Sequence, residues 1–397
     1  MHSPANPLIA NSMKIIKNTQ ELAAFCETCS HYDYVTIDTE FLRERTYYSK
    51  LCLVQMAHPG EGPETAALID PLADGISLDP LYDLFQNPSV TKVFHAARQD
   101  LEIFFVDKKI LPKPFFDTQI AAMVCGFGEQ VGYEKLVRAI CNEGLDKSSR
   151  FTDWSARPLS DKQKNYAIGD VTHLRQIYEF LAKKIHKSGR QSWVEEELAI
   201  LMDPKTYVVE PSQAWRRIKT RSSSWKMIAA VQELAKFRES LAQSRNIPRN
   251  RIYKDDALLE LAATRPKNIG EISKSRLLLR EARKGQIADG ILAAIAKANT
   301  YKSSDVERIE HSREKPMGKE GLAELLRVLL KAKAEEYGVA QKLIATSADL
   351  DQIALGTPDQ RALTGWRAQV FGNDAQKLCQ GDVALSSNGK NVVVVNI

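Results

Sequence analysis

The stretch VTIDTEFLRERTYYSKLCLVQMA, residues 35–57, combines two apolar runs with a close pair of carboxylates. Two strand-like runs joined by a polar turn predict an antiparallel pair of neighbours in a sheet. Asp38 and Glu40 are two positions apart, so their side chains point to the same face of the strand. Like charges on one face of a buried strand repel each other and are costly to remove from water. We therefore expect a functional reason for this pair.

The rest of the first half predicts an α/β layer with a mixed sheet, because strands come first and helices mostly later. Further strands are expected at 14–17, 65–71 and 90–97, and helices at 19–30, 77–88, 98–110, 115–128, 132–145 and 160–189. Asn18 or Thr19 can cap the first of these helices. The helix at 160–189 is long and amphipathic, with apolar residues at near-helical spacing.

The second half predicts helices joined by short turns, with no convincing strand from residue 213 until the tail. KDDALLELAATRP, residues 254–266, aligns with TSADLDQIALGTP, residues 346–358, which indicates two copies of one small all-helical module. The polar segment 301–316 is interpreted as a linker, and NVVVVNI at 391–397 as a short strand or an unattached end. We predict three domains, 13–207, 208–300 and 301–397.

Charge is divided unevenly between the halves of the 397-residue chain. Residues 1–204 carry a net charge of −6 and residues 205–397 a net charge of +11, most of it between 208 and 300. This asymmetry favours a polyanionic partner that one half holds while the other acts on it. The alternative is a difference in solubility alone.

The sequence favours a cytoplasmic protein. No apolar run approaches the 18 residues of a membrane span, and the N-terminal stretch lacks the pattern of a secretion signal. Cys26 and Cys29 have C-x-x-C spacing, which can mark a redox or zinc half-site. No second pair completes a zinc set, so we interpret the six cysteines as reduced thiols.

Three further residues are placed to join the carboxylate pair. Asp100 begins a helix just after a predicted strand, and Tyr166 and Asp170 share one face of the long helix because they are four positions apart. Clustered acids repel and raise at least one pKa unless a cation neutralises them. All-oxygen donors select hard ions such as Mg²⁺ or Mn²⁺, and two such ions about 3.5–4 Å apart can clamp a phosphodiester.

These residues carry a family resemblance. IDTEF (37–41), HAARQDLEIF (95–104) and YAIGDVTHL (166–174) resemble the three exonuclease motifs of the DEDD superfamily, with the third in its tyrosine form. The neighbouring LCLVQMA and WSARPLSDKQKNYA resemble bacterial ribonuclease D, and the helical modules resemble HRDC domains. The resemblance covers the chain from about residue 14. It implies a ribonuclease H-like mixed-sheet exonuclease domain followed by two all-α HRDC-like modules.

The resemblance also implies roles for the site residues. Asp38, Glu40 and Asp170 would ligate one divalent cation, and Asp38 would bridge to a second that Asp100 reaches directly or through water. Tyr166 would orient the attacking water by hydrogen bonding. With two Mg²⁺ or Mn²⁺ ions, such a site hydrolyses RNA from its 3′ end and releases nucleoside 5′-monophosphates, with tRNA precursors as the implied substrate. The alternatives are a 3′→5′ DNA exonuclease and a non-catalytic RNA-binding protein.

Other residues are weighed as contacts for nucleic acid. Phe41 can stack on a terminal base or pack in the core. A basic cluster beside the exonuclease-like half favours phosphate contacts, although each member alone is better explained as a solvated helix face. Its candidate residues are Arg216, Arg217, Lys219, Arg221, Arg249 and Arg251. The last module has no net charge and is expected to enclose the substrate, in a protein that we expect to be a monomer.

Four further polar residues near the motifs receive other interpretations. His95 is expected to be a hydrogen-bonding neighbour because hard metals prefer oxygen, and His173 to lie on the helix surface. Asp117 is interpreted as a helix N-cap. Gln55 can face the site from the second strand but is assigned no role.

Overall fold

The computed structural model describes residues 14–145, 152–220, 222, 224–307, 317–358 and 360–397. They form two compact units. Unit 1 comes from Met1–Glu40, Cys52–Asp203 and Ser312–Ile397, and unit 2 from Phe41–Leu51 and Pro204–His311. The three predicted domains divide the chain at other positions and stay a prediction.

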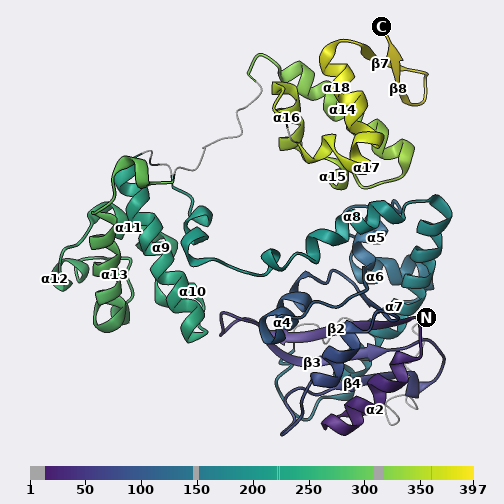
Figure 1. Cartoon of the computed structure of the whole chain (residues 1–397), viewed down its shortest axis with the longest axis horizontal. Helices are drawn as coiled ribbons and strands as arrows, with labels where there is room; N and C mark the ends of the chain where they lie inside the picture. The colour runs from purple at the N-terminus through teal and green to yellow at the C-terminus, as the bar shows by residue number, and fades with distance from the viewer. Residues whose placement is uncertain (1–13, 146–151, 221, 223, 308–316, 359) are drawn as a thin grey trace. The chain divides into compact units, whose positions relative to one another are not determined.

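Unit 1 is built on a mixed sheet of six strands in the order β1-β4-β3-β2-β5-β6. The strands are β1 (Lys14–Ile16), β2 (Tyr34–Leu42), β3 (Lys50–Ala57), β4 (Ala66–Ile69), β5 (Thr91–Phe94) and β6 (Phe115–Asp117). The pairs β1–β4, β2–β5 and β5–β6 are parallel, and β3–β4 is antiparallel. Figure 1 shows β2, β3 and β4 side by side. The predicted α/β class and its mixed sheet are confirmed.

Helices cover this sheet. They are α2 (Thr19–Ser30), α3 (Asp79–Gln86), α4 (Arg98–Lys108), α5 (Thr118–Val124), α6 (Tyr133–Leu136), α7 (Asp161–Ser188) and α8 (Gln191–Leu201), with a 3-10 turn η1 (Pro63–Thr65) and a π-helical turn η2 (Val137–Cys141). Asn18 caps α2 by accepting a hydrogen bond from the Glu21 amide, at 2.9 Å. Ser160 and Gln163 form a capping box at the start of α7. Polar side chains at both positions therefore fix where these helices begin.

One predicted helix is partly wrong. The sequence predicts a helix over 115–128, but Phe115–Asp117 form strand β6 and the helix α5 covers only Thr118–Val124. Phe115 pairs with Lys92 of β5 at the edge of the sheet. Three strand residues are too few to show alternation in sequence, so the following apolar helix masks them.

The C-terminal module, residues 317–397, also belongs to unit 1. Its elements are α14 (Glu320–Tyr337), α15 (Gln341–Ile344), α16 (Ser347–Leu355), η7 (Arg361–Leu363), α17 (Gly365–Arg367), η8 (Ala368–Gly372), α18 (Asn373–Gln380), β7 (Val383–Ser387) and β8 (Val392–Asn396). It shares one apolar core with α5 and α8, in which Val194 and Leu198 join Trp366 and Phe371. The segment is therefore packed into unit 1 through its own core residues.

The C-terminal module is not entirely helical. β7 and β8 form an antiparallel pair in which Val383 lies opposite Asn396. Of the two interpretations of the tail, the short strand is confirmed. β7 was not predicted because two of the five residues in its sequence, VALSS, are polar and its burial falls off along the strand.

Unit 2 is helical around a separate core. Its elements are η3 (Pro204–Thr206), η4 (Pro211–Arg217), α9 (Trp225–Arg245), α10 (Arg249–Ile252), α11 (Asp255–Thr264), α12 (Ile269–Ile272), η5 (Arg280–Arg283), α13 (Gly285–Ala298) and η6 (Ser303–Asp305). Figure 1 shows α11 and α13 beside the long helix α9. The β2–β3 connection also packs in this unit, where the Tyr47 hydroxyl donates to the buried Glu239 carboxylate and the Tyr48 amide donates to Asn246 at 2.9 Å.

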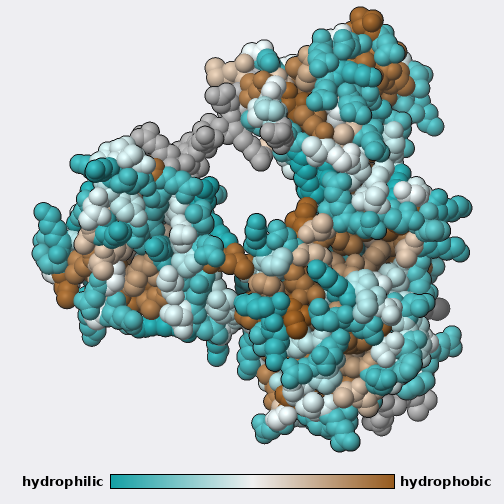
Figure 2. Space-filling view, viewed as in Figure 1, coloured by the Kyte–Doolittle hydropathy of each residue, from teal (hydrophilic) through white to brown (hydrophobic). Residues whose placement is uncertain are grey.

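The visible surface is mostly hydrophilic, and its apolar residues lie in small separate groups (Figure 2). Among the described residues, no helix is both long enough and apolar enough to cross a membrane.

Candidate active site

Strand β2 brings the two acidic residues of the opening stretch to one face of the sheet. Thr36, two positions earlier, shows which face this is, because its hydroxyl contacts the carbonyl oxygen of Val171 on α7 at 2.8 Å. Alternation along the strand then directs Asp38 and Glu40 toward the same helix. Carboxylate oxygens of Asp38, Glu40 and Asp170 all lie within 4.8 Å of one another. The structure thus gathers three of the predicted ligands at one point.

Asp100 lies next to this cluster, at the start of α4. It is 6% exposed and accepts a hydrogen bond from the Thr39 hydroxyl. Burial, and then the nearby charge of Asp38, raise the pKa of Asp100 well above its ordinary value. Burial also raises the pKa of Asp38 to about 6, against the opposing effect of a hydrogen bond from the Thr39 backbone. The two carboxyl groups therefore resist being ionised together.

The donors fit a hard divalent cation. Asp38, Glu40 and Asp170 each offer a carboxylate oxygen at mutual distances that one ion can span. Oxygen donors of this kind suit Mg²⁺ or Mn²⁺, and a cation stabilises the charged carboxylates, whose pKa values burial raises at Asp38 and Asp100. The buried Gln55 side chain is a second feature consistent with a bound ligand in this region, because neither of its polar atoms has a hydrogen-bond partner among the described residues.

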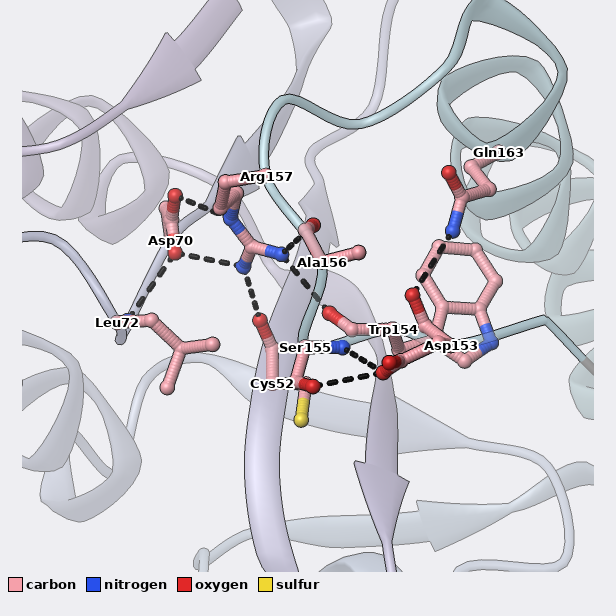
Figure 3. Close-up of polar contacts among 9 residues, drawn as sticks. All are labelled: Cys52, Asp70, Leu72, Asp153, Trp154, Ser155, Ala156, Arg157 and Gln163. Atoms are coloured by element: carbon pink, nitrogen blue, oxygen red, sulfur yellow. Dashed lines mark hydrogen bonds and ion pairs between the residues drawn. The ribbon is translucent and has the colours of Figure 1, made fainter.

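The helix α7, which carries Tyr166 and Asp170, is anchored by the segment just before it. Figure 3 shows Arg157 gripping Asp70 with two nitrogens, each at 2.7 Å, and reaching the Cys52 carbonyl of β3 at 2.6 Å. Although burial opposes the effect, hydrogen bonds from Arg157 keep the pKa of Asp70 below its ordinary value. The segment from Trp154 to Ser160 is thereby held against the sheet, which fixes the entry of the chain into α7.

Tyr166 is held by an aromatic neighbour from the same segment. The ring centroids of Trp154 and Tyr166 are 6.0 Å apart, and Trp154 is 2% exposed. Gln163, one turn before Tyr166, donates to the Asp153 carbonyl at 3.4 Å (Figure 3). These contacts restrict where the tyrosine ring can lie. Sequence reasoning missed Asp70, Trp154 and Arg157, although WSARP belongs to a stretch quoted for its family resemblance.

The other polar residues near the motifs have structural partners. His95 lies 3.0 Å from the Thr118 hydroxyl, the kind of hydrogen-bonding role that the sequence suggests. Asp117 caps α5 by accepting from the Gln119 amide at 2.7 Å, as predicted. His173 is more enclosed than predicted: its side chain is 18% exposed, and its Nε2 lies 2.9 Å from Glu143.

The candidate nucleic-acid contacts are spread over several environments. Phe41 is partly exposed near the end of β2, and alternation directs it to the face opposite the two carboxylates. Arg216 is exposed but donates to Gln213 at 2.6 Å and pairs with Glu307. Arg249 lies 3.5 Å from Glu239. The other exposed members of the cluster are Arg217, Lys219 and Arg251, and Arg221 lies outside the described residues.

Comparison with known proteins first defines the class. Residues 13–186 match the 3′-5′ exonuclease family and residues 228–310 match the HRDC domain. With its acidic cluster, this fold is that of a divalent-metal-dependent 3′→5′ exonuclease carrying an HRDC domain.

Relatives over the full length then define the family. A ribonuclease D of Jannaschia sp. is 58% identical over 96% of this chain and 99% of its own length. The ribonuclease D of Granulibacter bethesdensis is 45% identical over 97% of each chain. The crystal structure of Escherichia coli RNase D, described as an exoribonuclease involved in structured RNA processing, matches with a TM-score of 0.79 at 30% identity, over 93% of this chain and 99% of that one. The chain belongs to the ribonuclease D family.

Proposed function

We propose that this chain hydrolyses RNA from its 3′ end with two divalent cations, Mg²⁺ or Mn²⁺, and releases nucleoside 5′-monophosphates. Its class, a 3′→5′ exoribonuclease, follows from its family. The observation that supports the site is the gathering of Asp38, Glu40 and Asp170 within 4.8 Å, with the buried Asp100 beside them. Four acids in one small region are hard to explain as a feature of stability, because their mutual repulsion opposes folding.

Each residue has a part in this proposal. Asp38, Glu40 and Asp170 would hold one cation, and Asp38 would hold a second together with Asp100, directly or through water. When bound, the cations lower the pKa of a water molecule and stabilise the departing oxygen of the phosphodiester. Tyr166 orients the attacking water by hydrogen bonding through its hydroxyl.

Trp154 and Arg157 help to position Tyr166. Because Trp154 packs beside Tyr166 and Arg157 fastens the same segment to Asp70, the tyrosine hydroxyl is restricted before substrate arrives. Such pre-positioning lowers the reorganisation that the reaction requires.

The proposed substrate is structured RNA with a free 3′ end, including tRNA precursors, in the cytoplasm. The Escherichia coli relative is described as acting in structured RNA processing. Arg217, Lys219 and Arg251 of unit 2 are exposed and offer positive charge to phosphates. We also propose that 13–207 is the exonuclease domain, and that 208–300 and 301–397 hold two HRDC-like modules.

The proposal is tested with matched 3′-labelled and 5′-labelled RNA and DNA of one sequence, incubated with Mg²⁺, Mn²⁺ or EDTA. We expect shortening of the RNA from its 3′ end, mononucleotide 5′-phosphates as product, and loss of activity in EDTA. Asp38→Asn and Asp170→Asn should each abolish cleavage. Asp161→Asn is the matched control, because Asp161 lies on the same helix with its side chain 72% exposed.

Cleavage by Asp38→Asn at the rate of the unmodified protein would refute the assignment of the metal site. Faster loss of the DNA than of the RNA would instead make the chain a DNA exonuclease with the same site. RNA binding without any cleavage would favour a non-catalytic role.

A further inference from the structure

Gln55 is a buried side-chain amide that makes no hydrogen bond within the described part of the chain. Its side chain lies on strand β3 and is 0% exposed, and neither Nε2 nor Oε1 has a hydrogen-bond partner among the described residues. A buried amide that gives up water without gaining a partner opposes folding, whereas an apolar side chain of similar size would not. The neighbouring positions of the strand are filled by the buried apolar residues Val54 and Met56. Packing alone therefore does not explain an amide at this position.

A contact between β2 and β3 indicates a register in which Gln55 lies opposite Asp38. β2 and β3 are neighbours joined by only a few residues, so they run antiparallel, since a parallel pair needs a long crossover. Thr36 of β2 lies beside Ala57 of β3, because its hydroxyl is 3.3 Å from the Ala57 carbonyl oxygen. Moving two residues along each strand toward the connection leads from Thr36 to Asp38 and from Ala57 to Gln55.

The two residues also share a face. Ala57 packs against Val171 of α7, and Thr36 contacts the carbonyl oxygen of the same residue. Side chains two positions apart on a strand point the same way, so Asp38 and Gln55 both face α7. Directly opposite residues of an antiparallel pair have Cβ atoms about 4.5–5.5 Å apart, which is within reach of an amide and a carboxylate.

We propose that Gln55 positions Asp38 for the divalent cations: its side-chain NH₂ donates to the Asp38 carboxylate when that carboxylate ligates metal. This inference rests on the proposed function of the same site. An amide suits the position because it donates a hydrogen bond without adding charge beside the acids. A carboxylate that must contact two cations has to be held in one orientation, and outer hydrogen bonds do this for metal ligands in general.

The test separates metal binding from folding. The full-length protein, stripped of metal, is titrated with Mn²⁺ in a calorimeter, and its melting temperature is measured in EDTA. In Gln55→Met the shape of the side chain is kept and the donor is lost. We expect its metal-free melting temperature to equal or exceed that of the unmodified protein, while its Kd for Mn²⁺ rises about 10- to 100-fold.

Thr36→Val is the matched control on the same face. Thr36 has its own partners in Ala57 and Val171, so its loss should lower the metal-free melting temperature and leave the Kd for Mn²⁺ unchanged. A Gln55→Met protein that binds Mn²⁺ as tightly as the unmodified protein would overturn the inference while the proposed function stands. The same holds if Gln55→Met merely behaves like Thr36→Val. An unmodified protein that binds no Mn²⁺ at all would overturn both.

Discussion

Asp38→Asn should make the metal-free protein more stable at neutral pH. Burial raises the pKa of Asp38 from 3.8 to about 6 in the folded chain, whereas the unfolded chain keeps the ordinary value. The folded state therefore binds more protons than the unfolded state between these two pKa values. Its stability rises as the pH falls through 6 and reaches its full value below 3.8. Above pH 6 the folded protein carries the whole penalty of the buried charge.

The size of this penalty follows from the shift. A change of about 2 pKa units corresponds to about 3 kcal/mol in the free energy of unfolding. Asp38 is partly exposed, so solvent screening reduces this to about 1–3 kcal/mol. Asparagine has no charge at any pH. At pH 7.5 in EDTA the free energy of unfolding of the variant should therefore exceed that of the unmodified protein by about 1–3 kcal/mol. About half of that difference should disappear by pH 5.

Hydrogen exchange of β2 peptides in increasing urea is the suitable assay. The chain has two units, so one global unfolding curve does not report the strand alone. Asp33→Asn is the control, because Asp33 is exposed just before the same strand. Mn²⁺ at pH 7.5 should stabilise the unmodified protein and leave Asp38→Asn nearly unchanged, by linkage of binding to folding. Equal pH dependence of the unmodified protein and Asp38→Asn in EDTA would refute the reasoning.

Three further substitutions test other parts of the structure. Tyr166→Phe should lower kcat by about one to three orders of magnitude, roughly 1.4–4 kcal/mol, without changing the Kd for Mn²⁺; single-turnover cleavage and calorimetry measure the two quantities. Arg367 is 0% exposed and pairs with α8 carboxylates, so Arg367→Met should destabilise unit 1 by about 3–5 kcal/mol in hydrogen exchange, unlike a surface arginine change. Changing Arg217, Lys219 and Arg251 together to alanine should weaken RNA binding and lower the slope of log Kd against log salt by about 2, with an unchanged slope as the contrary result.

Short-range patterns in the sequence account for what could be predicted. The spacing of Asp38 and Glu40 on a strand, and of Tyr166 and Asp170 on a helix, states which side chains share a face. Strand alternation and apolar runs also gave the central strands and the long helix. β6 was missed because it has only three residues, and β7 because two of its five residues are polar.

Long-range contacts account for the features that could not be predicted from the sequence. The ion pair of Arg157 with Asp70 joins residues 87 positions apart, and each residue alone has no distinctive local pattern. Gln55 is a second residue whose environment could not be predicted from local sequence. Its position in the strand was evident, but its burial without a partner depends on the packing of α7 over the sheet.

Of the two helical parts of the second half, the C-terminal module belongs to unit 1 and the preceding helices to unit 2. A truncation that removes both parts therefore has two separate effects. The C-terminal module shares its apolar core with α5 and α8, and its Arg367 pairs with Glu196 of α8 at 2.7 Å. A protein ending at residue 207 would therefore expose Val194 and Leu198 and leave Glu197, the buried carboxylate of α8, without its arginine. Weaker RNA binding by such a fragment would combine a lost basic surface with a destabilised catalytic unit. Charge substitutions in unit 2 change only the first of these, and so they measure the contribution of the basic surface directly.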